Sequence, residues 1–217
     1  MKHCSIFILA LGLSYGSCNQ SNPSTSHLPE KTSASATTAI QKSDDKTEIQ
    51  TLIRSVLTWA DSEKAIDLLP VVTDENDSIY IGFDLEKHRE NLDKLEETGM
   101  FSQEFIGNYN QIILMLDKKL RTNDFEGGPW LVGYLPPFNF AGDVDPWCLC
   151  QDVPYDTPPP WEFVEVEPLN DQTYRWKWGR LNEGTDPSWK QFSYKFKVTK
   201  EESKWRVSYL EGFEFKP

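Results

Sequence analysis

The sequence predicts an α+β fold, in which N-terminal helices pack on a curved, cone-like antiparallel meander of four C-terminal strands. Two observations carry this prediction: apolar residues recur at helical spacing from residue 49 to residue 120, and from Trp161 onward apolar and polar residues alternate. The chain has 217 residues, of which 38% are hydrophobic and 13% aromatic, enough for one core. We therefore expect a single domain over residues 47–217.

Three helices are expected before these strands, and residues 78–83 are expected to form a short edge strand between the first helix and the second. Thr47 and Gln50 have capping-box spacing at the start of the first helix, which runs to Trp59. Asp84 is a suitable N-cap for the second helix, and Gly99 a suitable stop. Ser102 opens the third helix, whose wide apolar stripe predicts the central core helix. That stripe consists of Phe105, Ile106, Tyr109, Ile112, Ile113, Leu116 and Leu120.

His88 lies on the same face of the second predicted helix as Leu85 and Leu92. A lone histidine in that setting favours a hydrogen-bonded packing residue over a ligand. His3 and His27 fall in N-terminal segments that we expect to be unfolded. The sequence therefore predicts no metal site, no cofactor and no histidine-based catalytic triad.

Residues 122–160 form a long segment rich in proline and aromatic residues, holding eight of the 14 prolines. Long loops inside compact domains are uncommon and often functional. Two interpretations stay open: a cover packed over one end of the sheet, or a loop that faces a ligand or partner. Within it, Cys148 and Cys150 favour a local disulfide outside the cytoplasm, with two free thiols as the alternative.

The predicted strands are Trp161–Glu167, Gln172–Arg180, Trp189–Thr199 and Lys204–Phe215. Simple alternation places many aromatic side chains on one face of this meander. The alternation also places the carboxylate of Glu211 on this face, and together these residues form a candidate cavity. The alternative to a cavity is a core filled by the aromatic side chains. The alternative for Glu211 is a bulge at Gly212 that turns its carboxylate outward. The candidate cavity residues are Tyr174, Trp176, Trp178, Tyr194, Trp205, Tyr209 and Glu211.

The first residues, MKHCSIFILALGLSYGSC, contain a basic start, a short apolar run and small residues before Cys18. The run is too short to span a bilayer, which needs about 20 apolar residues, but suits a secretory signal. The segment resembles a bacterial lipoprotein signal peptide. The resemblance implies a signal peptide over 1–17, acylation of Cys18, and an envelope protein anchored by lipid in the outer membrane, facing the periplasm. An ordinary cleaved signal or an uncleaved anchor is the alternative.

Residues 18–46 are expected to be a disordered tether. Ten of the 28 residues from 19 to 46 are Ser or Thr, and none is aromatic. Such a composition buries too little apolar surface to offset the entropy of ordering.

The order of elements resembles the cone-shaped fold of nuclear transport factor 2 and ketosteroid isomerase. The ending KWRVSYLEGFEF is similar to the last strand of many such domains. The stretch GMFSQEFIGNY resembles uncharacterised bacterial envelope proteins of that fold, some of whose relatives look like immunity proteins against secreted cell-wall amidases of the type VI kind. No catalytic residue follows from this resemblance.

The formal net charge is −12, and it is unevenly distributed. Removal of residues 1–17 would leave −13; residues 47–160 carry 21 acidic and eight basic residues, whereas residues 161–217 carry ten of each. This balance argues against nucleic acid as a partner. We expect a non-enzymatic envelope module that binds a basic protein or a small ligand. The alternative is a small isomerase- or cyclase-like enzyme that uses Glu211 and a tyrosine.

Overall fold

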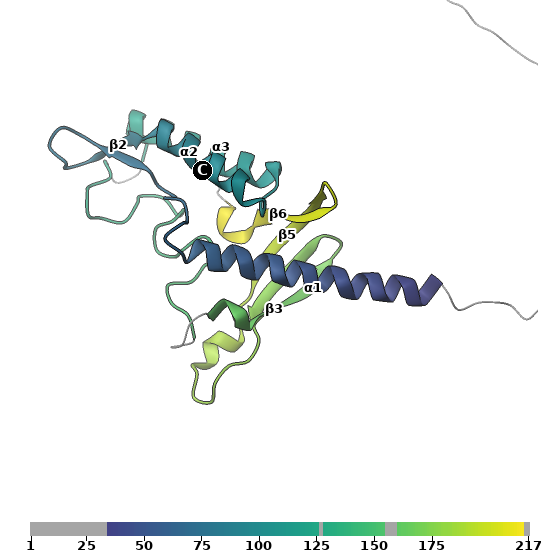
Figure 1. Ribbon diagram of the computed structural model, residues 1–217. Coiled ribbons are helices and arrows are strands. Elements are labelled where there is room, and N and C mark those ends of the chain that lie inside the picture. Colours follow the sequence, from purple (N-terminus) through teal and green to yellow (C-terminus); the bar gives the residue numbers. More distant parts are fainter. Residues whose placement is uncertain (1–33, 126–127, 155–159, 215–217) are drawn as a thin grey trace, which may run out of the picture.

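The computed structural model describes residues 34–125, 128–154 and 160–214, with side chains described from Asp44 onward. Three helices precede a four-stranded antiparallel sheet, so the predicted α+β class is confirmed. Figure 1 shows one long helix, α1, lying across the sheet, with α2 and α3 packed together on the other side of α1 from β3. Over the described residues the sheet does not close into a barrel.

Helix α1 spans Ala34–Ala60 and begins well before Thr47. The tether prediction is therefore wrong for residues 34–46, which are helical, and Thr47 is an interior position that accepts a bond from Thr51 Oγ1. The physical reason is contact with the sheet: the Asp45 carboxylate accepts hydrogen bonds from Lys200 and Trp205. Residues 1–33, with the predicted signal peptide, Cys18 and the rest of the tether, lie outside the described residues.

Helices α2 (Leu85–Thr98) and α3 (Gln103–Thr122) begin where their capping residues predict, and α2 also ends where Gly99 predicts. The Asp84 carboxylate accepts from the N–H groups of Glu86 and Lys87, and the Ser102 hydroxyl accepts from that of Phe105. Gly99 ends α2 with φ of 64°, a left-handed conformation that glycine adopts without steric cost. The predicted core stripe of α3 is buried along its whole length.

The sheet follows chain order: β3 (Val164–Asn170), β4 (Thr173–Trp178), β5 (Tyr194–Glu201) and β6 (Lys204–Leu210). Strand β3 has the predicted length but begins three residues later, and the other three strands are shorter than the sequence predicts. Short 3₁₀ turns, Pro160–Phe163 and Pro187–Lys190, replace the expected starts of β3 and β5, and Glu211–Phe213 replaces the expected end of β6. Buried and exposed residues alternate along β5, as expected for a sheet with one covered face.

Both outer strands of the sheet receive hydrogen bonds from the helical part. On β3, Arg54 Nε donates to the Val164 carbonyl at 2.9 Å, and Gln50 Oε1 accepts from the Val166 N–H at 3.2 Å. On β6, Val207 exchanges two backbone bonds with Met100 and Ser102, at 2.8 and 2.9 Å. These contacts occupy backbone groups that an open edge would offer to another strand.

A separate hairpin, β1 (Val71–Thr73) and β2 (Tyr80–Phe83), extends away from the sheet. The sequence predicted a short edge strand over 78–83, and β2 lies within that range. Loop residues pair with the hairpin: the Tyr80 N–H donates to the Trp130 carbonyl, and the Val132 N–H to the Ser78 carbonyl. The long loop is thus anchored at this end by backbone bonds.

The other end of the long loop closes the core. Trp147 is buried and contacts the rings of Trp59, Phe101 and Phe213. Phe140 is also buried. In this part the loop is a packed cover, the first of the two interpretations that the sequence left open.

Gly212 marks the tightest approach between this cover and the C-terminal turn. A Cβ placed there would lie 2.0 Å from the Pro146 carbonyl oxygen. We expect Gly212→Ala to lower the free energy of unfolding by about 1–3 kcal/mol or more, as overpacked sites do.

Gly107, inside α3, is the matched control because nothing lies within 4 Å of a Cβ there. Gly107→Ala should stabilise the protein by about 0.5–1 kcal/mol. Urea unfolding midpoints of both variants and the wild type provide the measurement. A Gly212→Ala variant as stable as the wild type would contradict the packing described here.

Candidate functional site

Three of the predicted cavity residues are packed into the core. Trp176 and Tyr194 are fully buried, and Trp178 is nearly so. The Trp176 and Tyr194 rings stack with centroids 5.7 Å apart, and Trp161 stacks on Trp178 at 5.6 Å. At these residues aromatic rings contact other rings, which is the filled core that the sequence left as an alternative.

Tyr174 and Trp205 line a groove at the surface. It measures about 600 Å³ and lies between α1 and the turn joining β3 to β4. The Trp205 indole N–H donates to Asp45 Oδ1 at 3.2 Å. Tyr174 stacks on Phe196, its partner across the strands, with centroids 5.7 Å apart.

Tyr209 lies on the opposite face of the sheet from the predicted cavity. Val198 pairs with Val207 but Lys197 with Tyr209, so the register skips Ser208. Such a bulge reverses which face later residues occupy. Tyr209 therefore lies under the Lys197 ammonium, 5.4 Å from its ring, and burial with a hydrogen bond to Glu214 raises its pKa to about 12.

Glu211 does not join the buried aromatic residues. Strand β6 ends at Leu210, and Glu211 begins a 3₁₀ turn. Its Oε2 accepts the Lys195 backbone N–H at 2.7 Å, and Oε1 lies 3.9 Å from the Lys195 ammonium. The prediction that the Glu211 carboxylate points into the cavity is therefore wrong: Glu211 links the end of β6 to the start of β5.

Cys148 and Cys150 form a disulfide with their Cα atoms 5.2 Å apart. Beside it, residues 65–68 and 141–151 enclose a hollow of about 560 Å³ whose lining includes Asp67, Asp143 and Asp145. Burial raises the pKa of Asp145, with the Asp61 carboxylate contributing and the Trp147 N–H opposing. An acidic recess of this kind favours positively charged groups.

His88 is a packing residue, as its position predicts. It is buried, its Nε2 lies 3.0 Å from Asn110 Oδ1, and its ring meets that of Tyr109 edge-on. Burial lowers the pKa of His88, with the Asn110 contact opposing. Across the described residues no three side chains of His, Cys, Asp or Glu are grouped to hold a metal ion.

An exposed apolar surface was not predicted from the sequence. It lies where the long loop meets β2, and Tyr134 and Leu135 are 70% and 65% exposed. The signal available in the sequence was the run Trp130 to Leu135, apolar apart from one glycine. We call this surface the loop–hairpin patch; it consists of Ile81, Leu131, Val132, Tyr134 and Leu135.

The patch has a fixed backbone. Leu131 pairs with Ile79, and the Tyr134 N–H donates to the Leu131 carbonyl at 3.2 Å around Gly133, whose φ is 83°. Trp130 anchors the turn from below, since its indole N–H donates to the Tyr134 carbonyl at 2.8 Å. The exposed side chains are therefore presented on an ordered turn.

No protein-family model, curated protein or solved structure matches this chain. Within the described part of the chain, no helix has the length and apolar character needed to cross a membrane.

The buried His88 makes stability depend on pH. Because its folded pKa is below the ordinary value of 6.5, the unfolded chain takes up the proton first as pH falls. The free energy of unfolding should therefore decrease from pH 7 to pH 5, by at most about 1.4 kcal/mol per pH unit for this one proton.

His88→Gln, which keeps an amide to bond Asn110, should flatten this part of the curve. Urea titrations of both proteins at several pH values give the difference in their free energies of unfolding. Carboxylates present in both proteins, such as Asp145, contribute equally and cancel from this difference. Parallel curves would show that His88 does not carry the effect.

Proposed function

We propose that this protein is a non-enzymatic binding module that captures a basic protein partner through the loop–hairpin patch and the acidic surface around it. The carrying observation is the exposure of Tyr134 and Leu135 on an ordered turn. Tyrosine is enriched among residues that dominate binding energy, and a preordered turn loses little entropy on binding.

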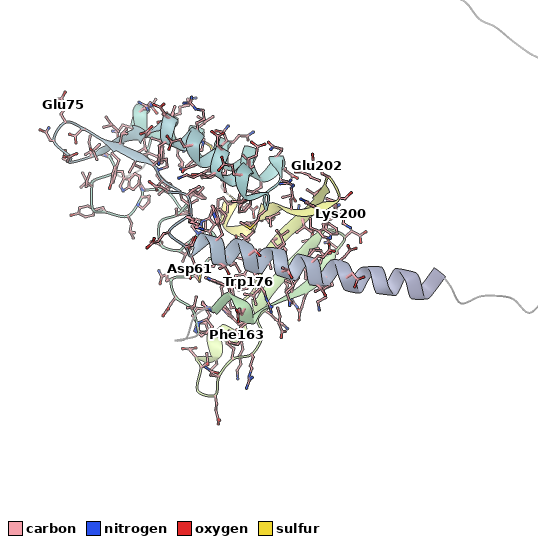
Figure 2. The ribbon with its side chains drawn as sticks, viewed as in Figure 1. Asp61, Glu75, Phe163, Trp176, Lys200 and Glu202 are labelled. Carbon is pink, nitrogen blue, oxygen red and sulfur yellow. A yellow bond between two sulfur atoms is a disulfide. The ribbon has the colours of Figure 1, made fainter. Side chains whose placement is uncertain are left out.

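The charge around the patch supports a basic partner. Residues 71–86 and 128–154 supply the hairpin and most of the loop, and they contain eight acidic residues and no Lys, Arg or His. Glu75 lies at the tip of the hairpin in Figure 2. The recess near Asp143 and Asp145 belongs to the same loop and could receive a basic side chain. A field of one sign speeds association with an oppositely charged partner.

A resemblance in sequence narrows the proposal. The similarity to envelope proteins of the nuclear transport factor 2 type, and to immunity proteins among their relatives, favours an inhibitor that neutralises a secreted cell-wall amidase. On this proposal the protein is lipid-anchored at Cys18 in the bacterial envelope, where it would meet such an enzyme.

The enzymatic alternative has less support from the positions of its residues. It requires Glu211 and a tyrosine to converge in an open pocket. The Glu211 carboxylate instead accepts the Lys195 N–H, and the Tyr194 hydroxyl bonds to Pro146 and Gly212. Tyr209 donates to Glu214 on the other face. Binding rather than chemistry is therefore the better proposal for these residues.

The test is affinity capture from envelope extract with the full chain as bait, followed by mass spectrometry. Tyr134→Ser combined with Leu135→Ser should reduce recovery of a basic partner at least about tenfold, since truncating a central tyrosine commonly costs 2 kcal/mol or more. Both side chains are exposed, so the fold should be unaffected. The captured protein is then purified and its cell-wall hydrolysis measured with and without the bait.

Leu114→Ser is the matched control, because Leu114 is an exposed leucine on α3, outside the patch and outside the groove described below. It should recover the partner as the wild type does, and recovery should fall as salt rises. Equal recovery by the patch variant and the wild type would refute the proposed surface. A partner that binds but is not inhibited would refute the immunity-like version alone.

A further inference from the structure

The groove between α1 and the β3–β4 turn is a second site, built from residues other than those of the loop–hairpin patch. Its volume of about 600 Å³ is within the range of small-molecule pockets. Aromatic rings form part of its wall, and carboxylates come from both the helix and the turn. The residues used below are Asp45, Leu169, Asp171, Tyr174 and Trp205.

The aromatic walls are held in place by the protein itself. The Trp205 ring is fixed by its N–H bond to Asp45, and Tyr174 by stacking on Phe196. The turn is also fixed, since the Val198 N–H donates to the Gln172 carbonyl at 3.0 Å. A ligand would therefore meet a largely preformed surface.

The groove lining holds the carboxylates of Asp45 and Asp171 and the ammonium group of Lys46, and the Lys200 ammonium opposes the effect of the two carboxylates on the pKa of Tyr174. Burial raises the pKa of Tyr174, and the carboxylates of Asp45 and Asp171 raise it further. Both carboxylates therefore act on the same space beside the Tyr174 hydroxyl. The faces of tyrosine and tryptophan rings also carry negative potential, which attracts cations within about 6 Å.

One ammonium group of the protein itself already lies between the Trp205 ring and the Asp45 carboxylate. Lys200 Nζ lies 4.4 Å from the centre of the Trp205 ring and 3.0 Å from Asp45 Oδ1. Figure 2 shows Lys200 near the end of the β5–β6 hairpin, beside Glu202. Both Asp45 contacts, from Lys200 and from Trp205, are made to Oδ1. Lys200 shows how an ammonium group fits between this ring and this carboxylate.

We propose that the groove binds an alkylammonium group, with the cation between the aromatic faces and the carboxylates. The aliphatic stem would lie along Pro168 and Leu169, which form the apolar side of the groove. A neutral sugar could also stack on the rings, but it could not take the place of the Lys200 ammonium between Trp205 and Asp45. The site does not depend on the proposed partner of the loop–hairpin patch.

The test uses the full chain labelled with ¹⁵N, in which the indole N–H signals of the tryptophans are observed by NMR at low salt. Trp205→Phe assigns the Trp205 signal by its disappearance. Titration with cadaverine, a diamine with a five-carbon stem, should shift this signal saturably, with a dissociation constant in the millimolar range. The same concentrations of 1-pentanol, which has the stem without the charge, should leave it unmoved.

Variants locate the binding. Asp171→Asn should weaken cadaverine binding at least fivefold, and Asp45→Asn should abolish the shift. Lys200→Met keeps the stem but removes the competing ammonium, so cadaverine should bind several-fold more tightly. Glu202→Gln is the control: it removes one negative charge from the neighbouring turn, outside the groove lining, and should change the affinity less than twofold.

Other results would overturn the proposal. An equal shift with 1-pentanol would indicate a merely apolar groove, and a saturable shift with N-acetylglucosamine but not cadaverine would indicate a sugar site. Weakening by Glu202→Gln as strong as by Asp171→Asn would indicate general attraction to an acidic protein. Asp45→Asn could disturb α1, and changes in the other indole signals would reveal this. Asp171 makes none of the contacts by which Asp45 holds α1, so Asp171→Asn still tests the proposal in that case.

Discussion

The Tyr194 hydroxyl joins strand β5 to the long loop and to the C-terminal turn. It donates to the Pro146 carbonyl in the long loop at 2.8 Å and accepts from the Gly212 N–H in the C-terminal turn at 2.9 Å. Burial raises the pKa of Tyr194 well above its ordinary value, so the hydroxyl stays protonated and remains a donor. Gly212 is required because a Cβ would collide with Pro146. This contact holds the loop against the core at Pro146, beside the packing of Trp147.

This closure determines where a binding site can lie. With Trp147 and Phe213 packed over α3 and Trp176 stacked on Tyr194, the concave face of the sheet is occupied by the protein's own rings. Hollows instead lie at the margins, among them those beside the acidic loop residues and beside the β3–β4 turn. Recognition by surface features therefore agrees better with this structure than chemistry in a central cavity.

The sequence predicted local structure well where one side chain decides it. The carboxylate of Asp84 and the hydroxyl of Ser102 bond the first N–H groups of their helices, and such caps are visible from residue type and spacing. Alternation likewise predicted the buried face of β5. The polar face is confirmed by Glu167, whose carboxylate pairs with both Arg175 and Lys177.

What the sequence could not predict depended on distant contacts. The bulge at Ser208 changes the face of Tyr209, yet nothing in the alternating run marks one residue as extra. Asp45, in the early part of α1, bonds to Lys200 and Trp205, which lie 155 and 160 positions further along the chain. The loop–hairpin patch required knowing that Leu131 pairs with Ile79.

The treatment of the sheet edges limits how a partner can bind. Arg54 and Gln50 bond the backbone of β3, and residues 100–102 bond that of β6. A partner that adds a strand needs a free row of N–H and C=O groups. Strand addition at Val164, Val166 or Val207 would therefore have to displace bonds that the protein already makes. The hairpin tip at Glu75 and the groove near Lys200 lie at opposite ends of the molecule in Figure 2, which would let both sites be filled together.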